Sequence, residues 1–313
     1  LYTWEWTVKV PQPLVMASSG TMTDMQQDGK FTNYTIKESV PSGLASIILG
    51  RFSVVTDPPE ENRKRLIRVF AQAGQLDAAE EIRVQAHDII DYFEELFQSD
   101  YPYPELDIAQ MPFGMGFAQA PPGLVQMSGE AYLSKTLLAT VYNVNDPVIR
   151  EMFLPHEIAH QWWGHTIGTR TGHDYWLMEA GAEYSAALFW EAAEGQKEYD
   201  KNVKYWLKRR NAQNTNKTSS LWIAATGRNS KRYVATIYGR GPLLYHELRM
   251  SLGFEKFVSV LRAMLFEWKG DKLATEDFKM VLEKATGLSF DQYFESFVYH
   301  NEPLSGASPE DMQ

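Results

Sequence analysis

The stretch His156-Glu157-Ile158-Ala159-His160-Gln161-Trp162-Trp163-Gly164 carries the strongest chemical signal in this chain. On a helix, residues four apart share one face, with Cβ atoms about 5–6 Å apart, so His156 and His160 can converge on one metal ion. Zinc accepts imidazole nitrogens at about 2.0–2.1 Å. Glu157 comes one residue after the first histidine, beside the metal, where a carboxylate can take a proton from metal-bound water. The spacing therefore predicts a zinc-binding helix.

A catalytic zinc ion needs a third protein ligand and one open position for water. The segment Trp176-Leu177-Met178-Glu179-Ala180 supplies a candidate, because eighteen residues separate His160 from Glu179. The run from Ala180 to Ala193 predicts a second helix facing the first. We therefore predict one Zn²⁺ per chain, with His156, His160 and Glu179 as its ligands. In the alternative interpretation, both histidines are core or solvated residues of an aromatic-rich helix.

The first 57 residues alternate apolar and polar positions in short runs, over 2–10, 31–38 and 46–55, which predicts a small β region. Asp57-Pro58-Pro59 interrupts this pattern, because proline cannot donate to a β ladder and restrains the residue before it. We predict a domain boundary there, a second domain over 58–304 and a tail over 305–313.

The second domain begins with mixed structure and continues as helices. Strands are predicted over 65–71, 106–111 and 124–128, and apolar residues at helical spacing predict a helix over 77–97. From Asp146 onward the pattern is mostly helical, with Gly253 and Gly287 as expected helix C-caps. The predicted fold class is α+β.

Composition excludes several classes of partner and site. The chain has 313 residues, a net charge of −10 and no cysteine. Nucleic-acid binding depends on basic surfaces, so the acidic net charge argues against it. The same acidity favours a solvated helix face as the interpretation of the basic run from Lys201 to Arg210. Without cysteine, a metal site must use histidine and carboxylate ligands. No apolar run reaches the roughly 18 residues of a membrane-spanning helix. Because the chain begins with Leu1 and not with methionine, we expect either a processed product or a domain of a larger polypeptide.

These motifs resemble those of the alanyl aminopeptidase family of gluzincin zinc metallopeptidases, which also includes leukotriene hydrolases. The resemblance rests on the residues from His156 to Gly164, on Asp174-Tyr175-Trp176-Leu177-Met178-Glu179 and on Tyr238-Gly239-Arg240-Gly241. It implies a thermolysin-like catalytic domain over 58–304, with a small mixed β-sheet lobe and a mostly helical lobe. Residues 1–57 would then be the end of the family's N-terminal β domain.

The resemblance also implies roles for individual residues. It makes Glu157 the general base of a peptidase and Tyr238 the donor that stabilises the oxyanion, with His156, His160 and Glu179 as zinc ligands. From the residues alone, glycines next to Tyr238 allow close backbone approach to a ligand, and a preorganised donor is worth about 10²–10³ in rate. A half-buried aromatic residue with a satisfied hydroxyl is the alternative interpretation.

One segment departs from the family pattern. The family's Gly-Ala-Met-Glu-Asn segment pairs with the substrate backbone and holds its free amino terminus through the glutamate. The matching residues here are Gly116-Phe117-Ala118-Gln119-Ala120, so Gln119 replaces that glutamate. A charge-assisted hydrogen bond becomes a neutral one of roughly half the strength. We expect a peptide substrate along Gly116 to Ala120, with weakened recognition of the free amino terminus.

Three further residues have open interpretations. Pro155 either kinks the zinc helix or lies near its start. Glu183 shares a helical face with Glu179, and either orients a zinc histidine or is an exposed charge. His165 is a hydrogen-bond donor near the metal, an extra ligand, or an ordinary surface or core residue.

Two hypotheses about function follow. The first is a zinc-dependent, aminopeptidase-like peptidase that hydrolyses peptide bonds. The second is a catalytically weak peptide-binding or regulatory module of a larger, membrane-tethered protein. The intact Glu157 argues against the second, because a purely structural zinc site has no need of it. The family also allows a non-peptide substrate such as an epoxide, for which no residue here argues.

Overall fold

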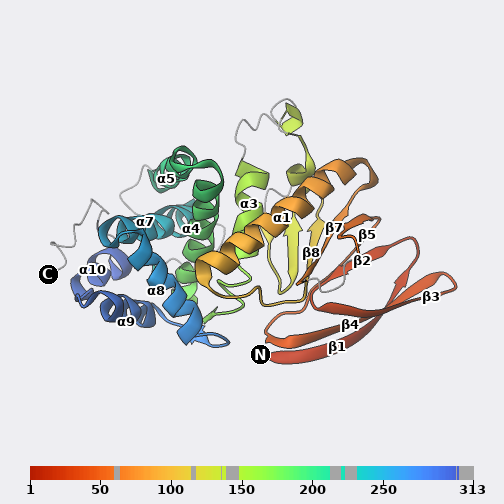
Figure 1. Cartoon of the computed structure of the whole chain (residues 1–313), viewed down its shortest axis with the longest axis horizontal. Coiled ribbons are helices and arrows are strands. Elements are labelled where there is room, and N and C mark those ends of the chain that lie inside the picture. The colour runs from red at the N-terminus through yellow and green to blue at the C-terminus, as the bar shows by residue number, and fades with distance from the viewer. Residues whose placement is uncertain are drawn as a thin grey trace. The chain divides into compact units, whose positions relative to one another are not determined.

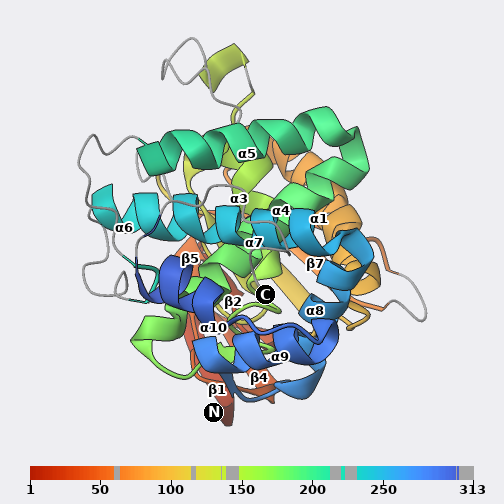
Figure 2. The ribbon, with the colours of Figure 1, turned by 90° about the vertical axis from the view of Figure 1, so that its left-hand side faces the viewer.

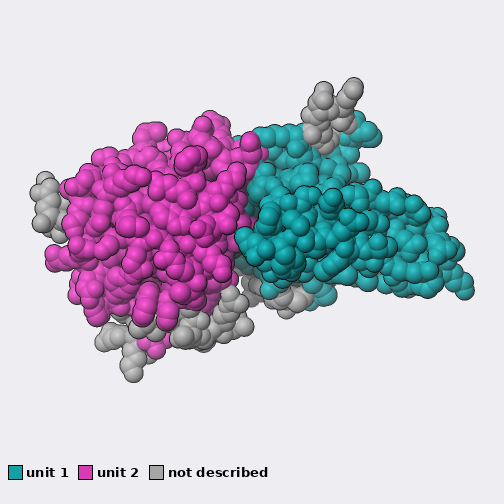
Figure 3. Space-filling view, turned by 90° about the horizontal axis from the view of Figure 1, so that it is seen from below, with its two compact units in different colours: residues 1–91, 101–161 teal, residues 92–100, 162–313 magenta. Residues whose placement is uncertain are grey.

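The computed structural model describes residues 1–59, 64–113, 118–134, 136–138, 148–211, 220–222, 231–300 and 302. Contacts between Cα atoms divide the chain into two units (Figure 3). The first unit comprises residues 1–91 and 101–161, and the second comprises residues 92–100 and 162–313.

The first unit begins with antiparallel strands, drawn in red to orange in Figure 1. They are β1 (Tyr2–Pro11), β2 (Val15–Ser18), β3 (Thr21–Asp28), β4 (Phe31–Ser42) and β5 (Ile47–Gly50). β4 lies between β1 and β3, and β2 pairs with β5. Burial alternates along β4, as the period of the sequence predicted, and a small core forms around Val10, Met16, Tyr34 and Ile36.

The predicted strand over 46–55 is two strands in the structure. β5 ends at Gly50 and β6 (Ser53–Thr56) begins three residues later. At Gly50 an added Cβ would lie 2.4 Å from the Phe52 ring, so the chain turns tightly here. The turn lets β5 pair with β2 while β6 joins the next sheet.

A mixed sheet forms the rest of this unit. Its order is β6, β7 (Leu66–Ala71), β8 (Glu105–Gln110), β10 (Leu124–Met127) and β9 (Ala118–Gln119). β7, β8 and β10 are parallel, and antiparallel β6 and β9 form its edges. The predicted helix is confirmed as α1 (Leu76–Phe97), preceded by η1 (Ala73–Gln75), and it supplies the crossover from β7 to β8 that a parallel pair needs. The parallel strands are largely buried, as expected for such a sheet.

After β10 come the short helix η2 (Gly129–Tyr132) and, further along the chain, the helix α3 (Val148–Ala159). α3 packs on β10, on η2 and on the edge strand β9. Pro155 lies inside α3, seven residues after its first residue Val148, so the interpretation that it lies near the helix start is wrong.

The second unit is mostly helical, as predicted from Asp146 onward. Its helices are η3 (Gly172–Asp174), α4 (Tyr175–Glu194), α5 (Gln196–Asn211), α6 (Lys231–Ala235), the π-helical turn η4 (Thr236–Arg240), α7 (Gly241–Leu252), α8 (Phe254–Glu267), α9 (Thr275–Thr286), α10 (Asp291–Phe294) and the π-helical turn η5 (Glu295–Tyr299). A short parallel pair joins β11 (Gly168–Thr169) to β12 (Lys272–Leu273). Gly253 and Gly287 are C-caps with positive φ, as predicted.

α4 is the central helix of this unit. It contacts α5, α7 and η4, and Figure 2 shows α5 running alongside α6 and α7. Aromatic rings fill the space between these helices, because Tyr184 of α4 contacts Trp206 of α5, Tyr245 of α7 and Phe257 of α8. Such ring pairs stabilise a core beyond the area that they bury. None of the helices in the described ranges is long and apolar enough to cross a bilayer.

Candidate active site

His156 and His160 of the predicted zinc helix converge in the structure. Their Nε2 atoms lie 3.0 Å apart, and the two rings meet edge to face with centroids 4.6 Å apart. His160 follows the last residue of α3, and its backbone N–H still donates to the His156 carbonyl at 3.2 Å. The helical turn therefore extends through the second histidine and keeps both side chains on one face.

Glu157 is buried on the same helix, next to His156. Burial removes a carboxylate from bulk water, so it normally requires a polar partner. Pro155 precedes this pair inside the helix and cannot donate a backbone hydrogen bond there. α3 thus presents two imidazoles and one carboxylate within a single turn, as the sequence predicted.

Glu179 lies in the first half of α4 and is also buried. Among the residues that the structure describes, His156, His160 and Glu179 form a group that could hold a metal ion, with one ligand atom from each within 4.8 Å of the others. His165, the alternative extra ligand, is not a member of that group.

The donor set fits zinc. Two imidazoles and one carboxylate leave a fourth position open, which is the arrangement of catalytic zinc sites. Two nitrogens at zinc-ligand distance in a tetrahedral site lie about 3.3 Å apart, and the Nε2 atoms of His156 and His160 are 3.0 Å apart. The two rings are therefore already oriented toward one point.

Tyr238 belongs to the π-helical turn η4, where its side chain is partly buried. Its hydroxyl is hydrogen-bonded to Glu179, and its ring contacts Tyr233 edge to face. Burial and the charge of Glu179 raise the pKa of Tyr238 well above its ordinary value. The phenol therefore stays protonated near neutral pH, and it is a hydrogen-bond donor next to one of the predicted ligands.

Part of the predicted substrate segment is described. Gly116 and Phe117 lie outside the described residues, whereas Ala118 and Gln119 form the edge strand β9, with Gln119 exposed. Among the described strands β9 pairs with β10 alone, so it forms an edge of the described sheet. Ala120 follows directly after the strand. An edge strand can accept another extended chain through backbone hydrogen bonds.

Gln161 has a role that the sequence reasoning missed. It follows His160 directly, is fully buried, and contacts the turn after β9 with both ends of its amide. Oε1 accepts from the Gly123 N–H at 2.9 Å, and Nε2 donates to the Pro121 carbonyl at 3.3 Å. Its place directly after the second histidine was the available signal, but its partners, some forty residues earlier, were not predictable from spacing.

Glu183 is not the exposed helix charge that was one of its two interpretations, because it is buried. The indole Nε1 of Trp206 donates to Glu183 Oε1 at 3.0 Å, and Arg209 Nη1 lies 3.6 Å from the same oxygen. Both partners come from α5, whose basic run was predicted to form a solvated face. The prediction is confirmed for Lys201, Lys204 and Lys208, which are exposed, and it is wrong for Arg209, which is partly buried.

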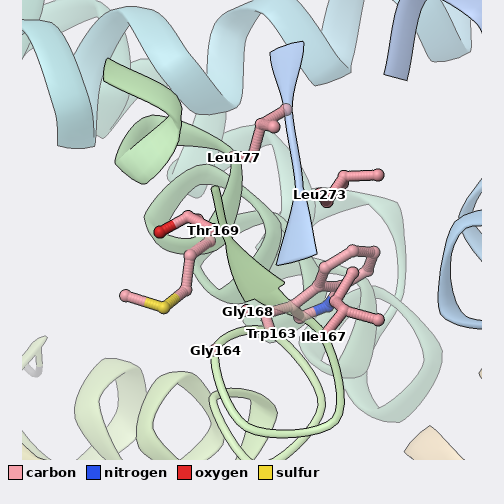
Figure 4. Close-up of a pocket in the computed structure, with 8 residues that line it drawn as sticks. Trp163, Gly164, Ile167, Gly168, Thr169, Leu177 and Leu273 are labelled. Atoms are coloured by element: carbon pink, nitrogen blue, oxygen red, sulfur yellow. The ribbon is translucent and has the colours of Figure 1, made fainter. Parts of the chain in front are cut away.

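A small pocket lies beside the residues that precede Glu179 (Figure 4). Its lining is mostly apolar and includes Trp163, Leu177, Met178 and Leu273. Trp163 is fixed there by a hydrogen bond from Nε1 to Ser185 Oγ at 3.0 Å. The pocket is a packing feature at the start of α4 and offers few polar groups to a ligand.

The model of the peptidase family M1 domain matches residues 83–297. The chain belongs to peptidase family M1. The match includes both helices that carry the metal-ligand group and the turn that carries Tyr238. It confirms the resemblance stated from the motifs, because the alanyl aminopeptidases belong to this family.

Known aminopeptidases are similar to half of the chain or more. Aminopeptidase M1-B of Oryza sativa subsp. japonica is 25% identical over 288 residues, which cover 90% of this chain and 32% of the relative. Glutamyl aminopeptidase of Mus musculus is 29% identical over 160 residues, covering 50% of this chain and 16% of the relative. The chain therefore spans about a third or less of the length of these relatives.

Solved structures of the family confirm the α+β fold class. A mutant of an M1 zinc metallopeptidase from Deinococcus radiodurans, solved with a bound Tyr-Ser-Ala substrate, superimposes with a TM-score of 0.68 at 21% sequence identity. The superposition covers 96% of this chain and 65% of that one. This M1 fold accommodates the mixed sheet and the helices described above.

Proposed function

We propose that the chain is a zinc-dependent metallopeptidase with aminopeptidase-like chemistry. The observation that carries the proposal is the convergence of the His156 and His160 Nε2 atoms, 3.0 Å apart on a helix that also presents buried Glu157. Membership of family M1 supports it. We assign one zinc ion per chain to His156, His160 and Glu179.

Zinc bound there would supply a water molecule with a pKa lowered to about 7 and an electrophile for the carbonyl oxygen of the substrate. Glu157 would accept the proton of the attacking water as that water's oxygen bonds to the carbonyl carbon. The same carboxylate would then pass the proton to the amine nitrogen as the C–N bond breaks. A buried carboxylate next to the ligands suits this double role, because bulk water does not compete for the proton.

Tyr238 would donate its phenolic hydrogen to the oxyanion of the tetrahedral intermediate. A tyrosine hydroxyl keeps its proton near neutral pH, as a donor to an oxyanion must. The hydroxyl is held by Glu179 in the structure, so it is positioned before a substrate arrives. A preorganised donor of this kind contributes about 10²–10³ in rate.

The peptide substrate would bind as an added strand along the edge strand β9 and the residues flanking it, from Gly116 to Ala120. Extended backbone on the free side of Ala118 and Gln119 would supply hydrogen bonds that are independent of side-chain identity. Because Gln119 is neutral, its bond to a substrate ammonium is weaker than that of a carboxylate. We propose that the chain distinguishes poorly between free and blocked amino termini.

We also propose a division of the chain that follows the Asp57-Pro58-Pro59 break. Residues 1–57 would be the end of a β domain, and residues 58–304 the catalytic domain. The matched family region begins at residue 83, inside the second of these, and ends before residue 304. The predicted tail over 305–313 lies outside the described residues.

The proposal is tested by peptide turnover with zinc restored. Purified chain, freed of metal and reloaded with one equivalent of zinc, is incubated with matched short peptides that carry a free or an acetylated amino terminus. We expect cleavage that needs zinc, with rates for the two peptides within about tenfold. A strong preference for the free amine would show that another residue anchors it. Tight peptide binding without zinc-dependent turnover would favour the alternative, a peptide-binding or regulatory module.

A further inference from the structure

Arg209 lies in the last turn of α5, and its surroundings differ from those of its basic neighbours. Its side chain is only 23% exposed, whereas the adjacent Lys208 is exposed. A long basic side chain that is partly buried loses rotamer freedom and hydration, so it needs compensating contacts. Arg209 makes such contacts with a buried carboxylate and with two tyrosine rings.

The first contact is with a buried acid on a neighbouring helix. Arg209 Nη1 lies 3.6 Å from Oε1 of Glu183, and only 5% of the Glu183 side chain is exposed. The indole of Trp206, one turn earlier on α5, donates to the same oxygen at 3.0 Å. Glu183 therefore holds the end of α5 through one hydrogen bond and one ion pair, and a charge this buried requires such partners.

The second contact is with two tyrosine rings. The guanidinium carbon lies 4.2 Å from the ring centroid of Tyr205 and 5.6 Å from that of Tyr238. Both distances lie within the range of about 6 Å over which a cation is attracted to an aromatic face. Arg209 thus joins a buried carboxylate of α4 to the ring of the proposed oxyanion donor.

The backbone next to Tyr238 is also held against α5. A Cβ added to Gly239 would lie 2.9 Å from the backbone nitrogen of Arg210 and 3.3 Å from the carbonyl oxygen of Trp206. Only glycine allows so close an approach without a shift of one backbone. The turn η4 and the end of α5 are therefore packed together at both the backbone and the side-chain level.

We propose that Arg209 is a positioning residue for Tyr238, held by Glu183 and acting through the face of the tyrosine ring. The inference rests on the proposed function, because it deepens the role given there to Tyr238. Two residues would then hold Tyr238. Glu179 accepts the hydrogen bond of its hydroxyl, and Arg209 contacts the face of its ring and so fixes the plane of the ring.

This arrangement predicts where the effect of Arg209 will be seen. A hydroxyl that acts only when an oxyanion forms is needed in the transition state and not in the ground state. Misplacing its ring should therefore lower kcat and leave KM nearly unchanged. The energy of a cation–π contact, converted to a rate, corresponds to a change in kcat of about 3- to 30-fold when the contact is lost.

The test compares Arg209→Met, Arg209→Lys and the control Lys208→Met, which removes an exposed cation from the adjacent position. Each is made in the wild-type and in the Tyr238→Phe background, and kcat, KM, zinc content and melting temperature are measured. We expect Arg209→Met to lower kcat about 3- to 30-fold in the wild-type background and to have no further effect in Tyr238→Phe. Arg209→Lys should restore part of the loss. Lys208→Met should behave as wild type.

A second measurement does not depend on turnover. In metal-free protein labelled with ring-¹³C tyrosine, the Tyr238 resonance is identified by its absence in Tyr238→Phe. We expect Arg209→Met to shift it and Lys208→Met to leave it in place. The inference is overturned if the resonance is the same in all three proteins, or if Arg209→Met costs as much with Tyr238→Phe as without it. An inactive, zinc-loaded wild type with the expected shift would instead contradict the proposed function alone.

Discussion

Gln161 accepts a hydrogen bond from the backbone N–H of Gly123 at 2.9 Å. Gly123 has a φ of +64°, a left-handed conformation that favours glycine, and it forms the turn between β9 and β10. The residue directly after the second predicted zinc ligand therefore fixes the turn that follows the proposed substrate strand. Within this unit, the side chain of Gln161 connects the end of the proposed metal-binding helix to the edge of the sheet.

Replacing Gln161 by methionine should weaken both the fold and substrate binding. The substitution keeps the side-chain volume but leaves the Gly123 N–H buried without its acceptor, which costs about 1–3 kcal/mol. We expect a lower melting temperature and a higher KM for peptides, with a smaller change in kcat. Equal KM values for wild type and Gln161→Met would contradict the connection.

Replacing Gln119 by glutamate should restore recognition of the free amino terminus. A carboxylate makes a charge-assisted hydrogen bond to the substrate ammonium, whereas the amide of Gln119 makes a neutral one. The two bonds differ by about 1.4 kcal/mol, which corresponds to about a tenfold change in affinity. We expect kcat/KM to rise about tenfold for a free peptide, and the acetylated peptide serves as the internal control because it carries no ammonium. A parallel rise for both peptides would show that residue 119 does not meet the amino terminus.

Gly181 is required by the indole that packs over it. A Cβ at Gly181 would lie 2.8 Å from Cδ2 of Trp163, whose own position is fixed by Ser185. Gly181→Ala should therefore destabilise the second unit by about 1–3 kcal/mol, despite the better helix propensity of alanine. Urea unfolding measures the change. Gly74→Ala is the control, because nothing lies within 4 Å of its added Cβ.

Asp57 predicts a pH dependence of stability. Burial raises the pKa of Asp57, but hydrogen bonds from the Ile67 backbone, His87 and Arg83 outweigh burial and leave the pKa below 3.8. The Ile67 N–H donates at 2.8 Å, and His87 Nε2 lies 2.9 Å from Oδ1. A lowered carboxyl pKa contributes stability above the unfolded-state pKa, and that contribution disappears as the pH falls through the folded-state pKa.

The matching variant is Asp57→Asn, which keeps an acceptor for the Ile67 N–H and removes the charge. We expect a loss of about 1–3 kcal/mol in the free energy of unfolding near pH 7. The difference from wild type should shrink as the pH falls from about 4, the unfolded-state pKa of an aspartate, through the lower folded-state pKa, because the wild-type carboxylate becomes protonated over this interval. Chemical unfolding across that pH range measures it. A difference that stays constant with pH would show that charge is not the cause.

The sequence predicted those parts of the molecule whose signal is local. The helix α3 that carries the proposed zinc ligands, α1 and the helix of Glu179 follow from periodicity and motif spacing, and the alternation along β4 matches its burial. β3 was missed because its residues are mostly exposed and do not alternate, and β11 and β12 were missed because they have two residues each. Short or solvated strands depend on their partners more than on their own pattern.

Among the site residues, too, the sequence predicted the local arrangement but not the contacts made by tertiary packing. The convergence of His156 and His160 was predictable, because four residues along a helix return to the same face. The bond between Tyr238 and Glu179 was not, since it joins residues far apart in the chain. Arg209 was placed among solvated charges for the same reason. Its partners, Glu183 and Tyr238, come from two other elements that only tertiary packing brings to it.

The central claim is that His156, His160 and Glu179 bind one zinc ion that Glu157 uses for hydrolysis. The most direct test is zinc content and peptide turnover measured on the same dialysed samples of wild type, His160→Ala and Glu157→Gln. We expect one zinc per chain with turnover in wild type, little zinc in His160→Ala, and full zinc with almost no turnover in Glu157→Gln. Full zinc retention in His160→Ala, or undiminished turnover in Glu157→Gln, would contradict the claim.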